Sequence, residues 1–399
     1  MTEFEPNDFV QARNNEVMLG LTPHALKYLT NHTTLALPDR TLQVGPEAFA
    51  NVFVRPQTTN NFYWDLQMND GLKTIGARAF EGCTNLFQQL KFPGSVEEIG
   101  DWAFFGCNHL WGELHIPGKL KYIGSGAFKY CSLKSIVIPE GVTTLGDSAF
   151  YGCSNLQSVT LPRSLKFIGD SAFYGCRSLT QVNIPSNVEK VGQSAFRGCS
   201  SLSSVTISEG VKSFGEYSFM GCDHLTSIVF PSSVVEIGEQ AFADCVTLAS
   251  VAMTGSVTNI ATGAFNGCNM VKSAEIPGDI YIDQIFPRAA ITNIVICEGT
   301  RRIDVGLFWG QSNLISIELP KSVEEIEYSA FGYCTNLKEV NIPTEVKDIP
   351  YQAFIGCTNL IAVTIPQGVT NIGDSAFEGC DKLQSIGLPA SLKSIGMSA

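Results

Sequence analysis

The sequence predicts a right-handed, curved solenoid of about 15 coils of ~23 residues each, held together by one parallel β-sheet. The phrase GDSAFYGC occurs twice, starting at Gly146 and again at Gly169, 23 residues later. Phenylalanine recurs with the same step along most of the chain, and a cysteine usually follows it three residues later. A fixed period in the twenties indicates stacked coils rather than separate globular domains.

The recurring phenylalanines define the extent of the array. Steps of 23 residues separate Phe150, Phe173, Phe196, Phe219, Phe242 and Phe265, and again Phe308, Phe331, Phe354 and Phe377. Steps of 24 residues separate Phe80, Phe104 and Phe128, while Phe49 and Phe286 mark two weaker copies. We therefore expect an array over residues 36–399, with an insertion around 50–70 and an irregular segment around 276–308.

The residues within one unit explain how a coil folds. In the stretch LQSVTL, Val159 and Leu161 alternate with polar residues, which predicts a short strand with one buried face. Pro162 ends the strand because proline cannot donate a further ladder hydrogen bond. Gly169 permits a sharp turn, after which Phe173 enters the interior. Each coil can bury its apolar face only against its neighbours.

The two ends of the chain differ from the repeat. Residues 1–35 are expected to form an N-terminal cap, in which Thr22 and Pro23 would begin a short helix. The last copy, LPASLKSIGMSA, ends at Ala399 just before its phenylalanine is due. The sequence therefore predicts a C-terminus truncated in the middle of a repeat.

Composition excludes several classes of protein. The 399 residues are 44% hydrophobic and only 16% charged, which excludes a disordered chain. A formal net charge of −12 argues against nucleic-acid binding, which needs a clustered basic surface. No apolar run reaches the ~20 residues of a membrane span, and no signal peptide is visible at the N-terminus.

The cysteines form a second column. Twelve of the thirteen lie three residues after a repeat phenylalanine; the exception is Cys297. Stacking would place neighbouring cysteines about 5 Å apart, a spacing that also permits disulfides. Each has equivalent neighbours on both sides, however, and no CxxC or Cys/His cluster indicates a metal. Packing as a small apolar side chain is the favoured interpretation; disulfides, metal binding and redox chemistry are the alternatives.

No catalytic centre is evident in the sequence. The five histidines have no Ser-His-Asp or Cys-His arrangement that the repeat would bring together. The glycines recur at turns and never form a phosphate-binding loop with a lysine. We therefore expect a protein that is not an enzyme and that has no cofactor and no metal.

The unit L-x-x-V-x-I-P-x-x-V-x-x-I-G-x-x-A-F-x-G-C resembles the BspA-like, or type 5, leucine-rich repeats of bacteria and some protozoa. The similarity covers about Leu35 to the C-terminus. It differs from commoner leucine-rich repeats because proline, rather than a buried asparagine or cysteine, follows the strand. The resemblance implies an α/β-type leucine-rich repeat fold and a bacterial cell-surface or secreted protein that mediates adhesion. Its partners would be proteins or glycans, such as host extracellular matrix proteins. The alternative is a structural spacer that presents another domain absent from this chain.

Aromatic residues mark two places where a partner could bind. The insertion holds Phe62, Tyr63 and Trp64, and the slot after the repeat phenylalanine holds Tyr151, Tyr174 and Trp309. Such residues are enriched in binding surfaces. The alternatives are that the first group completes the cap and that the others lean on neighbouring coils. The outward strand positions, in contrast, hold small polar residues such as Ser158 and Thr160.

Overall fold

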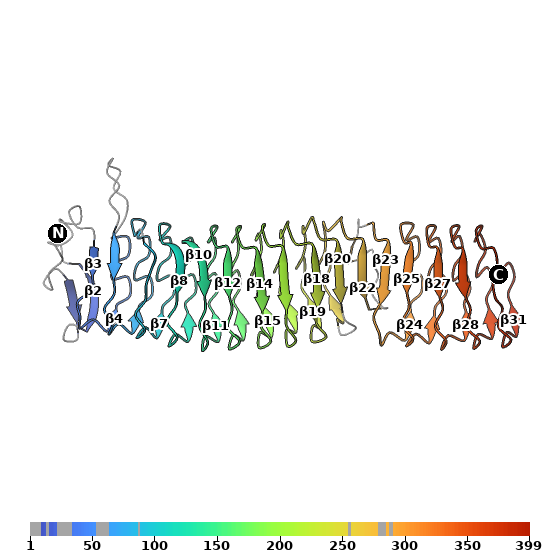
Figure 1. Ribbon diagram of the computed structural model, residues 1–399, viewed down its shortest axis with the longest axis horizontal. Helices are drawn as coiled ribbons and strands as arrows, with labels where there is room; N and C mark the ends of the chain where they lie inside the picture. Colours follow the sequence, from blue (N-terminus) through green and yellow to red (C-terminus); the bar gives the residue numbers. More distant parts are fainter. Residues whose placement is uncertain are drawn as a thin grey trace, which may run out of the picture. The chain divides into compact units, whose positions relative to one another are not determined.

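The computed structural model describes residues 9–12, 16–21, 34–52, 64–86, 88–253, 257–277, 285–286 and 290–399. These residues fall into two compact units, Met1–Leu225 and Thr226–Ala399. In each unit the chain winds into coils whose strands pair with the equivalent strands of the next coil (Figure 1). The predicted solenoid of about 15 coils is confirmed.

Most of the described coils contribute two strands rather than the single one expected. In the coil around Phe173, β12 (Ser158–Thr160) is followed by a turn after Pro162 and by the two-residue strand β13 (Phe167–Ile168). Turns over residues 170–175 then close the coil. The coils therefore build two rows of parallel strands, one from longer and one from shorter strands (Figure 1).

In the first unit, both rows run through successive coils. The longer strands are β3 (Thr34–Ala36), β5 (Asp65–Gln67), β8 (Trp111–His115), β10 (Ser132–Val137), β12, β14 (Gln181–Ile184) and β16 (Ser204–Ile207). The shorter strands are β4 (Gln43–Val44), β6 (Thr74–Ile75), β7 (Glu98–Ile99), β9 (Tyr122–Ile123), β11 (Thr144–Leu145), β13, β15 (Lys190–Val191) and β17 (Ser213–Phe214). The longer strands form the sheets β3-β5 and β8-β10-β12-β14-β16, and the shorter strands pair in chain order.

The second unit repeats this arrangement. The longer strands form one seven-stranded sheet of β18 (Ser227–Phe230), β20 (Ser250–Met253), β22 (Ser273–Ile276), β23 (Asn293–Ile296), β25 (Ser316–Glu318), β27 (Glu339–Asn341) and β29 (Ala362–Thr364). The shorter strands are β19 (Glu236–Ile237), β21 (Asn259–Ile260), β24 (Arg302–Ile303), β26 (Glu325–Ile326), β28 (Asp348–Ile349), β30 (Asn371–Ile372) and β31 (Ser394–Ile395).

The fully described coils close with turns where an α/β-type repeat would place a helix. Ser171 and Gly175, with φ of 56° and 68°, both adopt the left-handed conformation within one turn segment. Two left-handed residues four positions apart interrupt the α-helical backbone, so a helix cannot form there. The solenoid stands as predicted, with turns as its connections.

The repeat phenylalanines stack on one another in the interior of each unit. Phe173 is fully buried, and its ring lies 5.4 Å from that of Phe150 and 5.2 Å from that of Phe196, with interplanar angles of 10° and 8°. Phe49 stacks on Phe80 at 5.2 Å, as expected for a first copy despite its irregular spacing. In the second unit, equivalent stacks join Phe242 to Phe265 and join Phe308, Phe331, Phe354 and Phe377. Offset ring pairs of this kind add to the stability gained by burial.

Gly169 is required for a reason that the sequence did not reveal. A Cβ at this position would lie 2.6 Å from the carbonyl oxygen of Leu145 and 2.8 Å from the backbone nitrogen of Asp147. The glycine therefore permits close approach of the preceding coil. Aspartate side chains also join the neighbouring coils here. Asp147 Oδ1 accepts a hydrogen bond from the Asp170 backbone N–H at 2.9 Å, and Asp170 Oδ1 accepts one from the Gln193 backbone N–H at 2.7 Å.

The N-terminal segment begins with an antiparallel pair, β1 (Phe9–Ala12) and β2 (Val17–Leu21). Strand β2 then pairs parallel with β4, the first short strand of the array. The helix expected at Thr22 and Pro23 lies outside the described residues, and the cap over residues 1–35 stays a prediction.

The irregular segment around 276–308 does not interrupt the longer-strand sheet. Strand β22 pairs directly with β23 in the register Ser273↔Asn293, so these strands are 20 residues apart where most are 23 apart. Phe286 is buried, and its ring lies 5.1 Å from that of Phe265. The chain thus keeps both the strand pairing and the phenylalanine contact across the irregularity.

Candidate functional site

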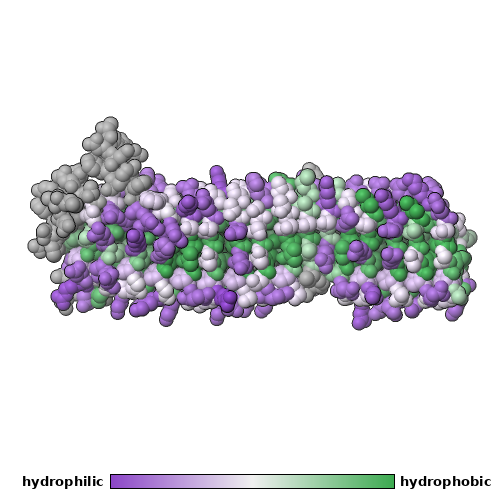
Figure 2. All heavy atoms as spheres, viewed as in Figure 1, coloured by the Kyte–Doolittle hydropathy of each residue, from purple (hydrophilic) through white to green (hydrophobic). Residues whose placement is uncertain are grey.

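The outward face of the longer strands in the first unit is mostly polar, with Trp111 and Val137 as exposed apolar exceptions. A shallow groove of 280 Å³ crosses β12, β14 and β16, and polar side chains such as Thr160, Gln181 and Asn183 line it. In the second unit the equivalent face mixes the exposed Val229 with Glu318 and Glu339. In neither unit do aromatic side chains gather at the outward strand positions of the fully described coils. Figure 2 shows apolar residues between polar ones on the face in view.

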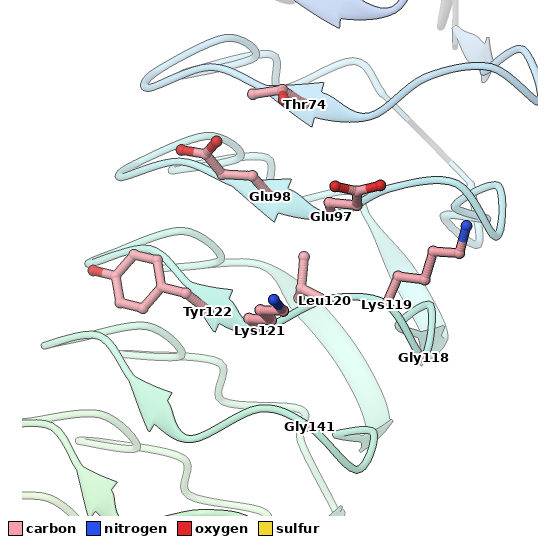
Figure 3. Close-up of a pocket in the computed structure, with 9 residues that line it drawn as sticks. All are labelled: Thr74, Glu97, Glu98, Gly118, Lys119, Leu120, Lys121, Tyr122 and Gly141. Atoms are coloured by element: carbon pink, nitrogen blue, oxygen red, sulfur yellow. The ribbon is translucent and has the colours of Figure 1, made fainter.

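A second groove of 770 Å³ lies beside the shorter strands β6, β7 and β9. Gly118, which follows the strand-ending Pro117, opens it, because nothing lies within 4 Å of the place where its side chain would be. The groove has Leu120 in its lining and charged groups of both signs, as Figure 3 shows. The lining residues are Thr74, Glu97, Glu98, Gly118, Lys119, Leu120, Lys121, Tyr122 and Gly141. This mixed charge selects no single class of ligand, and the sequence reasoning did not identify the groove.

Tyr151 and Tyr174, two of the predicted partner-binding residues, are brought together. Their rings stack in parallel, with centroids 4.5 Å apart and an interplanar angle of 2°. Lys129 Nζ lies 4.1 Å from the centroid of Tyr151, and the Arg197 guanidinium carbon lies 5.8 Å from that of Tyr174. Both rings are half-buried and lean on their neighbours, which agrees with the alternative that the sequence left open.

The contacts continue on both sides of this pair. Tyr130 packs on Tyr151 at 5.5 Å, and Lys129 Nζ also lies 5.4 Å from the rings of Tyr130 and Trp102. We call the group the cation–aromatic ladder; it consists of Trp102, Phe105, Lys129, Tyr130, Tyr151, Tyr174, Arg197 and Tyr217. Burial raises the pKa of Tyr151, and the neighbouring Tyr130 and Tyr174 raise it further. Sequence reasoning missed both cations, although Lys129 and Arg197 occupy the same slot after the repeat phenylalanine as the tyrosines.

Trp309, the predicted residue of the second unit, has a more open environment. Its side chain is 44% exposed and contacts Tyr333, which is 45% exposed, at 4.8 Å and 69° between the ring planes. The indole lies over Gly332, where an added Cβ would collide with the ring. Tyr328 and Tyr351, in the turns of successive coils, are also about half exposed. This group was only partly found, because the sequence singled out Trp309 alone.

The aromatic residues of the N-terminal insertion are not brought to a surface that the structure describes. Trp64 is only 5% exposed, and its backbone N–H donates to the carbonyl of Asn85 at 2.8 Å. Its ring therefore belongs to the interior and not to the partner surface that the sequence suggested. Phe62 and Tyr63 lie outside the described residues.

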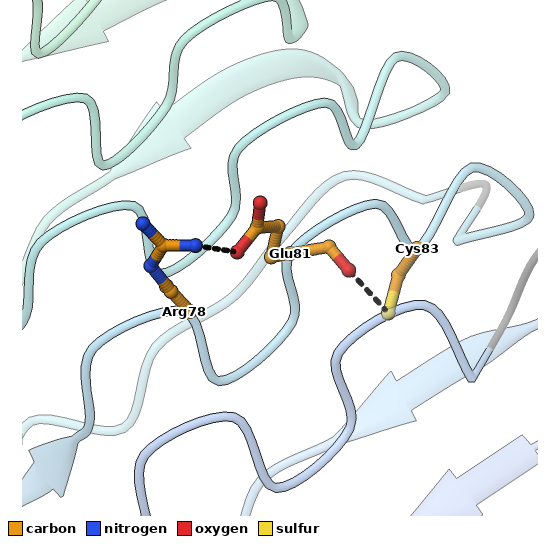
Figure 4. A network of polar contacts seen from close by, with 3 residues as sticks. All are labelled: Arg78, Glu81 and Cys83. Carbon is orange, nitrogen blue, oxygen red and sulfur yellow. Dashed lines mark hydrogen bonds and ion pairs between the residues drawn. The ribbon is translucent and has the colours of Figure 1, made fainter.

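The cysteine column is a packing element that also makes hydrogen bonds. All thirteen cysteines are free thiols. Cys176 Sγ donates to the carbonyl oxygen of Phe150 in the preceding coil at 3.3 Å, and equivalent contacts of 3.0–3.5 Å recur along both units. Cys83 Sγ makes the equivalent contact with the carbonyl oxygen of Phe49. The side chain of Glu81 pairs with Arg78, and the backbone carbonyl of Glu81 also points towards the Cys83 thiol (Figure 4). The thiol therefore gives the carbonyl of the preceding coil a hydrogen-bond donor that a purely apolar side chain of the same size would not provide.

These thiols are poorly suited to chemistry. Burial raises the pKa of Cys153 and of Cys199 to about 12, so neither is a thiolate at neutral pH. Within the described ranges, no group of three or more His, Cys, Asp or Glu side chains could hold a metal ion. Within the same ranges, no helix is long and apolar enough to span a bilayer.

The coil geometry and the closed interior define a leucine-rich repeat solenoid. The family model described as the BspA type leucine rich repeat region matches over residues 57–132, 73–203, 121–245, 189–313 and 282–399. The chain belongs to this BspA-type family. Proteins of this class generally serve as protein-interaction scaffolds and are typically not enzymes.

Two solved structures are similar to this chain. A leucine-rich repeat protein from Bacteroides ovatus is 26% identical; the match covers 94% of this chain and 91% of that chain, with a TM-score of 0.59. A leucine rich cell surface protein from Faecalibacterium prausnitzii is 24% identical over 98% of this chain and 92% of that chain, with a TM-score of 0.44. No curated protein matches the chain. The first of these structures supports the same fold for nearly the whole chain.

Proposed function

We propose that this chain is a non-catalytic scaffold that mediates adhesion at a bacterial cell surface by binding host or matrix proteins. The observation that carries the proposal is the exposure of Trp309, Tyr328, Tyr333 and Tyr351 on the turn side of neighbouring coils. Large aromatic rings exposed together are costly in water and are enriched in binding surfaces. The BspA-type assignment supports the surface location and the adhesive role, since the resemblance implies both.

The direct test is the binding of the whole chain to immobilised fibronectin, fibrinogen and a glycan array, measured by biolayer interferometry. Saturable binding to a matrix protein is the expected result, and a matched leucine-rich repeat protein from a cytosolic source serves as the control. If neither the matrix proteins nor the glycans bind, the adhesive proposal fails.

A structural spacer is the second candidate function. The cation–aromatic ladder favours the spacer, because its tyrosine rings contact each other and the side chains of Lys129 and Arg197, which leaves less ring surface for a partner. A spacer needs stable stacking of coils and no partner surface. It predicts that replacing the exposed aromatic residues of the second unit leaves every function of the intact protein unchanged.

A further inference from the structure

We propose that Trp309 and Tyr333 form an aromatic docking surface for a protein segment that carries arginine or lysine. The inference deepens the proposed scaffold function and rests on it, since it names the chemistry of the partner. The two rings contact each other at 4.8 Å, and each side chain is nearly half exposed.

The backbone at Tyr333 is left-handed, as it is at Tyr130 in the equivalent slot of the first unit. The φ of Tyr333 is 57°, in the slot before the cysteine where most coils have glycine with a positive φ. A non-glycine residue in the left-handed region raises the energy of the backbone by on the order of 1 kcal/mol. The chain keeps a tyrosine there, with its ring over Gly356 and at 69° to the ring of Trp309. Tyr130, with φ of 63°, packs against Phe105 in the same way, so in both units this conformation places a tyrosine ring beside the aromatic residue of the preceding coil.

The charge around these rings is negative. The turn segments 304–310, 327–333, 350–356 and 373–379 contain four acidic residues, Asp304, Glu327, Asp374 and Glu378, and no lysine or arginine. Arg302, in the preceding short strand, pairs with Asp304 at 2.8 Å and with Glu327 at 3.7 Å. One guanidinium thus faces two carboxylates, and the surface keeps a negative charge that complements a cationic partner.

The first unit shows which groups cover such rings in this molecule. There, Lys129 and Arg197 occupy the slot after the repeat phenylalanine and lie against the tyrosine faces. In the coils that follow Trp309, the same slot holds Gly332 and Ile355. The described part of the chain provides no lysine or arginine at these two positions, so a partner would have to supply the cation. A guanidinium or ammonium over an indole or phenol face provides that contact.

The experiment uses the whole chain and a fluorescent peptide of alternating glycine and arginine, with a citrulline peptide as its neutral counterpart. Anisotropy is measured at about 0.15 M salt, where weak long-range attraction to an acidic protein is screened. Replacing Trp309 and Tyr333 together by leucine keeps apolar side chains and removes the aromatic faces. We expect the Kd of the arginine peptide to rise roughly tenfold in this variant, and the citrulline peptide to bind roughly tenfold more weakly than the arginine peptide.

The matched control replaces Tyr151 and Tyr174 by leucine, and we expect it to leave the Kd unchanged. Circular dichroism and the midpoint of thermal unfolding establish that both variants are folded. Equal binding of the arginine and citrulline peptides, or equal weakening in both double variants, would overturn the inference. Weaker binding of a neutral glycan but not of the arginine peptide in the Trp309/Tyr333 variant would also overturn it, in favour of a carbohydrate.

The two proposals can fail separately. If the Trp309/Tyr333 variant binds matrix proteins as well as the native chain does, the docking surface is wrong and the scaffold function stands. If the native chain binds the arginine peptide through these residues but no matrix protein, the surface stands and the adhesive function fails.

Discussion

The phenylalanine stack can be tested by a double-mutant cycle on Phe150 and Phe173. The perturbation is the replacement of each residue by leucine, singly and together. Leucine keeps an apolar side chain in the slot, so the change removes mainly the stacking between rings. Both rings are fully buried, and their centroids are 5.4 Å apart.

The magnitude follows from the ring pairs that each substitution removes. Phe173 stacks on the rings of Phe150 and Phe196, and each such pair contributes about 0.5–1.5 kcal/mol beyond burial. The single variant at Phe173 should therefore lower the free energy of unfolding by about 1–3 kcal/mol. The double variant removes the shared pair only once. Its cost should fall short of the sum of the single costs by about 0.5–1.5 kcal/mol.

The assay is native-state hydrogen exchange of the amides in these coils, followed by mass spectrometry, because long repeat arrays need not unfold in one cooperative step. Phe128 and Phe173, which are separated by Phe150, form the control pair. Their costs should add within about 0.5 kcal/mol. An equal coupling in the two cycles would refute the view that neighbouring rings stabilise the stack through direct contact.

Three further predictions concern other parts of the coil. Burial raises the folded-state pKa of Cys153 to about 12, above its unfolded value. The stability that this thiol contributes is therefore complete below about pH 9 and is lost as the pH rises towards 12. Chemical denaturation across this pH range should show the decline in the free energy of unfolding, and a flat profile would contradict it. Gly118→Ala should raise the free energy of unfolding by about 0.4–1 kcal/mol because the site is open. Gly169→Ala should lower it by about 1–3 kcal/mol because the added Cβ meets the backbone of the preceding coil. Thermal unfolding ranks the two variants, and the reverse order would be inconsistent with the close approach of the coils. Lys129→Met should lower the free energy of unfolding by about 0.5–1 kcal/mol through removal of the ammonium over Tyr151; urea denaturation measures it, with replacement of an exposed lysine away from aromatic rings as the control.

Much of the coil could be predicted because the repeat displays its interior directly. Phe173 and Val159 recur at fixed intervals, and a side chain that recurs at a buried slot must stack on its equivalents. The short strand Phe167–Ile168 was missed because two residues show no alternation. The role of Gly169 was also missed, because close approach to Leu145 is a contact between coils and leaves no mark within one coil.

The candidate site was predicted less well, because exposure depends on what the neighbouring coil places beside a ring. Tyr151 and Trp309 occupy equivalent slots in the sequence. The slot one coil before Tyr151 holds Lys129, and the slot one coil after Trp309 holds Gly332, so one ring is covered by a cation and the other is open. Whether a ring is covered can be predicted only by comparing the residues at this slot in successive coils, because a single motif does not show its neighbours.

The coils are joined by hydrogen bonds and side-chain packing, and the free cysteines place no covalent link between them. This has a mechanical consequence. A force applied along the stacking direction meets the same weak set of bonds at each coil, so the chain should peel open one coil at a time. Each step would release 23 residues, about 80 Å of extended chain. A tether with these properties lengthens under load and dissipates work in many small steps instead of breaking in one.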